Sequence, residues 1–334
     1  MINIPFNQNF FEVHVKNLTE KVNNKIKSFD KTNLSINTIC CLNEIYINSE
    51  VIIKANIKEL QKIIKYFESK FYCSIGYEEN KQTELYITLS KIFIDDKTGL
   101  YKNFSNAKKN EYNAYQLVQS LNLKTCPYCN RNYIPFVKND EKKTRPQLDH
   151  FYPKAIYPFL ACSFYNLIPS CSTCNHMKSD EDSYKDEKNG ELVHPYNVKN
   201  DDFTFSYTFD NLDILKSIDK KNIRFEDEEK IKITLDTKYK KNNKYFQLEE
   251  IYQNHRDLVI ELILKEINYP KSYIEELVKN GFGTQEEIYR FIFSNYLEIN
   301  NFHKRPLSKL TYDIINELGI TDKIHLSINS YESN

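Results

Sequence analysis

The chain has 334 residues, 40% of them hydrophobic and 28% charged, which excludes a disordered protein and allows one large or two ordinary domains. Lysine plus arginine and aspartate plus glutamate number 46 each, so the formal charge is zero. This balance gives no global sign of a nucleic-acid partner, and any surface that binds phosphates must be a local patch.

The first twenty residues contain no continuous apolar segment after a basic start, so they are not expected to be a secretory signal. No stretch approaches the roughly 18 apolar residues that a membrane span requires. We therefore expect a cytoplasmic protein without a membrane partner. Thiols stay reduced in that compartment, which favours metal ligands or buried thiols over disulfides for the eight cysteines.

The N-terminal third is expected to be helical. Residues 1–30, about 50–72 and about 107–122 carry apolar residues at helical spacing, and a polar loop is expected at 76–82. In the second of these helices the spacing is regular, with apolar positions at Ile57, Leu60, Ile63, Ile64 and Phe67.

Residues 125–200 hold seven of the ten prolines and five of the eight cysteines. Because proline interrupts helices and central strands, this region predicts loops and short strands. The alternating apolar side chains of 202–209 then predict a half-buried strand, with 223–225 and 231–235 as its partners.

The rest of the chain is expected to return to helix, over 245–267, 271–280, 284–299 and 306–318. The predicted fold class is α+β, mostly helical, with a small antiparallel sheet and a central module of loops and short strands. The predicted regions are a helical N-terminal region at 1–122, the central module at 123–200, a small β segment at 201–240, and C-terminal helices packed on the module at 241–334.

Four cysteines stand in two pairs with the spacing of zinc knuckles, Cys126-Pro-Tyr-Cys129 and Cys171-Ser-Thr-Cys174. Four thiolates suit a tetrahedral Zn²⁺, and four protein ligands leave no open position, so this zinc is expected to be structural. Four unrelated cysteines, or a redox pair, are the alternatives. The long separation of the two pairs indicates that something substantial is inserted between them.

Polar residues that could take part in catalysis or bind a metal ion lie between and just after the knuckles. Asp149 and His150 stand in a predicted strand, 147–151, and Asn166 begins a second strand. Asn175 and His176 follow the last cysteine, where a helix is expected to begin. Side chains of consecutive strand residues point to opposite faces, so joint action of Asp149 and His150 requires a bend or a strand end there.

The order CPYC, LDHFYPK and YNLIPSCSTCNHMK resembles the zinc-framed HNH endonucleases, whose active module is a ββα-metal fold. The signature positions map onto His150, Asn166 and Asn175, the last being Asn where many members have His. The resemblance covers about residues 125–180. Segments 194–196 (HPY) and 305–310 (RPLSKL) also resemble bacterial HNH proteins, some of which stand beside an ATPase in Septu-type phage-defence pairs.

The resemblance implies an enzyme that hydrolyses phosphodiester bonds with a divalent ion, Mg²⁺ or Mn²⁺, and DNA is favoured over RNA as its substrate. His150 would be the general base, and an unperturbed imidazole protonates near pH 6.5. Asn166 would orient that ring by a hydrogen bond. The oxygens of Asp149 and Asn175 would hold the divalent ion, with His176 as the alternative to Asn175.

Several basic residues are candidates for contact with nucleic acid, although each could equally be a solvated surface side chain: Arg131, Arg145, Lys154 and Lys178. Two other functions stay open at this point. One is a nuclease for RNA such as tRNA, and the other is a catalytically silent zinc module that binds nucleic acid or a partner protein.

Overall fold

The computed structural model describes residues 1–72, 81–106, 111–139, 141–182, 184, 190–210, 223–269 and 271–319. The chain divides into two compact units. The N-terminal unit comprises Pro5–Leu123 and Ile134–Lys188, and the C-terminal unit comprises Met1–Ile4, Lys124–Tyr133 and Asn189–Asn334. Across the described part of the chain, no helix combines the length and apolar character that a bilayer crossing demands.

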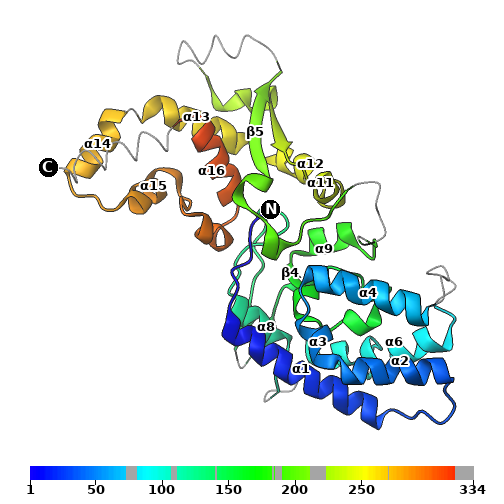
Figure 1. Ribbon diagram of the computed structural model, residues 1–334. Coiled ribbons are helices and arrows are strands. Elements are labelled where there is room, and N and C mark those ends of the chain that lie inside the picture. Colours follow the sequence, from blue (N-terminus) through cyan, green and yellow to red (C-terminus); the bar gives the residue numbers. More distant parts are fainter. Residues whose placement is uncertain are drawn as a thin grey trace. The chain divides into compact units, whose positions relative to one another are not determined.

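Helices make up most of the N-terminal unit: α1 Gln8–Ser28, α2 Ile36–Ile47, α3 Ser49–Lys54, α4 Ile57–Phe71, α6 Glu84–Phe93, α7 Leu100–Ser105 and α8 Ala114–Leu121 (Figure 1). Side-chain caps fix where several of them start. Asn7 caps α1, and Asn56 and Asn113 each form a capping box at the starts of α4 and α8.

These caps explain how the predicted helices differ from the observed ones. The predicted helix 50–72 is two helices, because the backbone leaves the helical conformation at Ala55 and Asn56 caps the start of the second helix. The helix predicted from about 107 begins at Ala114, after the Asn113 cap. Helices α2, α6 and α7 were not predicted, and most of the predicted loop at 76–82 lies outside the described residues.

The core of the N-terminal unit includes a histidine. His14 of α1 is fully buried, its Nε2 donates to the Cys162 carbonyl at 2.9 Å, and its Nδ1 therefore accepts from the Tyr112 hydroxyl at 3.1 Å. The ring also meets the Phe164 ring edge-on, with centroids 5.3 Å apart. Both ring nitrogens are satisfied, so this histidine is a neutral structural residue.

The two predicted strands at the centre of the chain are present. Strand β3 (Gln147–His150) pairs antiparallel with β4 (Leu167–Ser170), with Asp149 opposite Ile168. Helix α9 (Ser172–Lys178) follows at once. It starts earlier than predicted, because Cys171 caps it with its sulfur, which accepts from the Cys174 N–H at 3.4 Å. A short hairpin, β1 (Val137–Lys138) with β2 (Lys143–Thr144), precedes them.

The C-terminal unit contains an antiparallel pair, β5 (Thr204–Phe209) with β6 (Ile231–Asp236), and helix α16 (Ser308–Glu317) lies beside β5 (Figure 1). Asp313 of α16 accepts from the Phe205 N–H at 2.9 Å. The predicted strand at 223–225 is wrong. Phe225–Lys230 form a 3₁₀ helix, η6, where the Asp227 carboxylate accepts from the Arg224 N–H.

The other helices of this unit are α11 Lys240–Phe246, α12 Leu248–Tyr252, α13 Arg256–Asn268, α14 Lys271–Lys279 and α15 Gln285–Phe293. Two predicted helices prove shorter because single residues adopt left-handed backbone. Gln247, with φ of 45°, interrupts the predicted helix 245–267, and Ser294, with φ of 54°, ends the one predicted at 284–299.

The described residues are thus mostly helical, with three small antiparallel strand pairs. This arrangement is consistent with the predicted α+β class. The predicted region boundaries and the packing of the C-terminal helices on the central module stay predictions.

Burial of His14 should make the stability of the protein depend on pH. Burial lowers the pKa of His14 from its ordinary value near 6.5 to about 4, and the hydrogen bond to Cys162 opposes this only in part. Below pH 6.5 the unfolded chain gains a proton that the folded chain does not bind until about pH 4. The free energy of unfolding should therefore fall as the pH drops through this window.

The measurement is urea unfolding at pH 7.5 and pH 5.0 for the wild type and His14→Gln. The glutamine variant lacks the titrating group, so its loss of stability between the two pH values should be smaller by about 2 kcal/mol. Equal losses in the two proteins would show that the pKa of His14 is not lowered in the folded state.

Candidate active site

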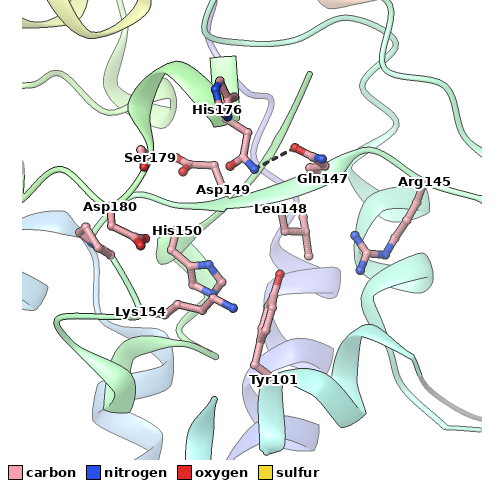
Figure 2. Close-up of a pocket in the computed structure, with 12 residues that line it drawn as sticks. Tyr101, Arg145, Gln147, Leu148, Asp149, His150, Lys154, His176, Ser179 and Asp180 are labelled. Carbon is pink, nitrogen blue, oxygen red and sulfur yellow. Dashed lines mark hydrogen bonds between the residues drawn. The ribbon is translucent and has the colours of Figure 1, made fainter. Parts of the chain in front are cut away.

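A pocket of about 440 Å³ opens in the N-terminal unit beside β3 and α9 (Figure 2). Its wall combines ionisable, polar and aromatic side chains from α7, the segment before β3, β3, the turn after β3, α9 and the residues that follow α9. They are Tyr101, Arg145, Gln147, Leu148, Asp149, His150, Pro153, Lys154, Asn175, His176, Ser179 and Asp180. Sequence reasoning singled out six of them: Arg145, Asp149, His150, Lys154, Asn175 and His176.

Asp149 and His150 both line the pocket although they are consecutive. Strand β3 ends at His150, and the chain bends at Phe151 and Tyr152. The strand end that joint action of the two residues requires is therefore present.

The His150 ring is held in one tautomer. Its Nε2 lies 3.1 Å from the Ala161 carbonyl oxygen, which can only accept, so Nε2 carries the hydrogen and Nδ1 keeps a lone pair. The Tyr101 ring meets it edge-on, with centroids 4.5 Å apart, and Figure 2 shows Tyr101 and Lys154 next to the imidazole.

The pKa of His150 is lowered to about 3, mainly by burial and further by the positive charge of Lys154. The hydrogen bond to Ala161 opposes this shift. The ring is consequently neutral throughout the physiological pH range, and the expectation of protonation near pH 6.5 is wrong for this buried site.

Asp149 lies in a buried ion pair that was not predicted. The Lys178 ammonium is 3.1 Å from Asp149 Oδ1, and the two side chains are 0% and 4% exposed. The same ammonium donates to the His150 carbonyl oxygen at 2.6 Å. The last residue of α9 therefore holds the end of β3, and Lys178, expected on the surface as a phosphate contact, is instead turned inward.

Asn175 and His176 both reach the pocket wall from α9. The Asn175 amide nitrogen donates to Gln147 Oε1 at 2.8 Å, the bond drawn in Figure 2. This bond engages the nitrogen and leaves the carboxamide oxygen available as a ligand. His176 is exposed, and Asp180 brings a second carboxylate to the pocket, a residue that sequence reasoning missed.

Asn166 is fully buried outside the pocket wall. Its oxygen accepts from the Tyr152 N–H at 2.7 Å, and its nitrogen donates to the carbonyls of Tyr152 and Leu160, each at 3.0 Å. The predicted bond from Asn166 to the His150 ring is not formed. Asn166 instead fixes the backbone of the loop that places the Ala161 carbonyl against that ring.

Two of the predicted cationic residues line the pocket. Lys154 lies over the Tyr101 ring, 4.8 Å from its centroid, and Arg145 lies over the Tyr115 ring at 5.6 Å. Arg131 belongs to the C-terminal unit and is not one of the residues that line the pocket. Tyr101 lies far outside the motif in sequence, so no local pattern could have marked it.

The four paired cysteines are buried, and their sulfurs all lie within 4.8 Å of one another. Zn–S bonds of about 2.3 Å place the sulfurs of a tetrahedral site about 3.8 Å apart, so this group can hold a metal such as zinc. Backbone N–H groups point at two of the sulfurs, from Arg131 to Cys129 and from Cys174 to Cys171, each at 3.4 Å.

A buried asparagine fixes the first knuckle within the C-terminal unit. Asn130, with φ of 49°, follows Cys129 directly. Its side chain donates to the Phe302 carbonyl at 3.0 Å and accepts from the Lys309 N–H at 3.0 Å. Sequence reasoning missed this residue, because only its left-handed backbone and its distant partners distinguish it from an ordinary turn asparagine.

A stretch of 61 residues, 18% of this chain, is 38% identical to the Septu protein PtuB of Bacillus thuringiensis. The match covers 21% of that protein. No family model matches the chain, and no solved structure matches it.

Loss of a cysteine pair should release the metal. Protein purified without added metal should contain about one zinc per chain by elemental analysis, and Cys171→Ser/Cys174→Ser should contain none and melt at lower temperature. Cys162→Ser is the control, since Cys162 is buried but lies outside the four-cysteine group. Full zinc retention in the double variant would contradict the assignment.

Asn166→Asp should be more harmful than an ordinary core substitution. It replaces an NH₂ group with a carboxylate oxygen that would face two carbonyl oxygens. We expect a loss of at least about 2 kcal/mol in the free energy of unfolding, because two buried acceptors would lose their donor. Urea unfolding measures this loss, and a variant as stable as the wild type would show that the loop does not depend on Asn166.

Proposed function

We propose that the chain is an HNH endonuclease that hydrolyses phosphodiester bonds with a divalent metal ion and acts on DNA. One observation carries this proposal. A neutral histidine with a lone pair on Nδ1, His150, lines a pocket together with the oxygen groups of Asp149 and Asn175. The order strand, strand, helix over β3, β4 and α9 agrees with a ββα-metal module.

His150 has the position and the tautomer that a general base requires. Proton transfer from water needs an unprotonated acceptor within the site, and the hydrogen bond from Nε2 to Ala161 leaves Nδ1 for this role. The carbonyl partner also stabilises the positive charge that the ring acquires when it takes the proton. Tyr101 and Ala161 together restrict the ring to one orientation, so little reorganisation precedes the transfer.

The oxygens near His150 fit a hard divalent ion. A carboxylate and a carboxamide oxygen are ligands that Mg²⁺ and Mn²⁺ prefer, and Asp149 and Asn175 supply one of each. His176, also on the pocket wall, is the alternative to Asn175. An ion bound there would stabilise the negative charge on the phosphate and on the leaving oxygen.

The cationic residues of the pocket suit a nucleic-acid substrate. Arg145 and Lys154 line its wall and would contact the phosphates that flank the scissile bond. Lys178 acts in this proposal through Asp149, because its ammonium is buried. Arg131 stays a candidate for a more distant contact. The four cysteines would hold a structural zinc that serves folding rather than the reaction.

The partial similarity to a Septu protein supports a role in antiviral defence. We place the nuclease in the bacterial cytoplasm, in antiviral defence, with an ATPase as its partner protein. The alternative to catalysis is a silent module that binds nucleic acid or a partner protein, and a cleavage assay separates the two.

The proposal predicts that substitutions of two neighbouring residues impair cleavage in different ways. His150→Ala removes the base but keeps the oxygen ligands, so single-turnover cleavage of supercoiled plasmid should slow by about 10²–10⁴-fold at any metal concentration. Asp149→Ala removes a metal ligand, so its activity should recover in part as Mg²⁺ or Mn²⁺ is raised.

His176→Ala is the matched control, because it removes an exposed imidazole from the same pocket wall. If Asn175 is the ligand, this variant should keep the wild-type metal dependence. RNA tested in parallel decides the substrate class. Wild-type rates in His150→Ala at saturating metal would refute the role of this residue, and no cleavage by the wild type in either metal would favour the silent module.

A further inference from the structure

Lys178 presents a buried charge that takes no direct part in the reaction outlined above. Its side chain is 0% exposed, and its ammonium contacts the Asp149 carboxylate and the His150 carbonyl at 3.1 and 2.6 Å. A lysine ammonium is costly to bury, so it stays in place only when paired and hydrogen-bonded. The pair therefore places a positive charge directly against the carboxylate that would hold the divalent ion.

The other charged groups around the pocket do not offset this ammonium. Arg145 and Lys154 add two further cations to the wall, whereas Asp149 and Asp180 are its two carboxylates. With Lys178 paired to Asp149, three cations face two carboxylates. The site carries a net positive charge before any ligand enters.

A divalent cation entering this site alone would have to share Asp149 with an ammonium and approach two further cations. Coulomb repulsion at such short range weakens its binding. A phosphodiester group brings a negative charge into the same pocket and reverses this balance. Two ligands that each reduce the repulsion felt by the other bind cooperatively, and the coupling is the same in both directions.

We propose that Lys178 is a positioning residue whose ammonium pairs with Asp149 before any ligand binds. As a result, the protein binds its divalent ion weakly by itself and tightly only together with the substrate phosphate. This inference rests on the proposed nuclease function, and it adds that metal loading depends on nucleic acid. The same ammonium fixes the end of β3 through the His150 carbonyl.

Titration of Mn²⁺ followed by electron paramagnetic resonance tests the proposal, because it reports the free ion and does not depend on turnover. The full-length zinc-loaded protein is used in the His150→Ala background, which slows cleavage, with and without a short DNA duplex. The duplex should lower the Kd for Mn²⁺ at least tenfold. In the absence of DNA, Lys178→Met should lower the Kd for Mn²⁺ about tenfold. The further decrease in this Kd on addition of the duplex should then be smaller than it is with Lys178.

Two further variants separate this role from a merely structural one. Lys178→Arg keeps the positive charge and should keep the weak affinity for Mn²⁺ in the absence of DNA. Lys142→Met removes an exposed lysine from the β1–β2 hairpin loop, so it lowers the net charge equally and should change the Kd less than twofold. A melting curve for each variant verifies its fold.

An unchanged or weakened affinity for Mn²⁺ in folded Lys178→Met would overturn the proposal. An equal Kd with and without the duplex, measured with Lys178 intact, would also overturn it, and this arm holds even if the methionine variant does not fold. Failure of the nuclease proposal looks different, since the wild type would then cut neither plasmid nor RNA whatever its affinity for Mn²⁺.

Discussion

The candidate site depends on where strand β3 stops, and the buried carboxamide of Asn166 sets that point. Beyond His150 the ladder ends with the Phe151 N–H, which donates to the Asn166 carbonyl oxygen at 3.0 Å, and the Asn166 side chain then bonds to the Tyr152 and Leu160 backbone. The chain can therefore turn at a place where two consecutive side chains, Asp149 and His150, both reach the pocket. The same bonds fix the loop that carries the Ala161 carbonyl. One neutral amide thus determines both the direction and the tautomer of the imidazole.

The charged groups around the site then act differently on the two neighbouring residues, His150 and Asp149. His150 is buried beside Lys154, and both effects disfavour a proton on its ring. Asp149 is buried against the Lys178 ammonium, with which it forms a direct ion pair. A single stretch of strand therefore presents a neutral acceptor and an anion side by side.

Local patterns in the sequence predicted the elements and the residue types at the site, because strand alternation, knuckle spacing and the Asp-His pair are short-range features. They predicted neither Tyr101 nor Asn130, whose partners are distant in the chain. Lys178 looked like a surface residue, because burial of a lysine depends on a carboxylate 29 positions away. The predicted Asn166 bond to the ring failed for the same reason, since spacing cannot tell which of several nearby carbonyls an imidazole will face.

Helix α9 has only seven residues, and a segment of that length has almost no tendency to be helical by itself in water. Its order comes from its two ends. Cys171 caps the first turn with its sulfur, and the buried ammonium of Lys178 closes the last. Chelation of an ion held by the cysteines would release one of these ends. The site would then be lost by local unfolding of α9, while the other helices of the N-terminal unit remain folded.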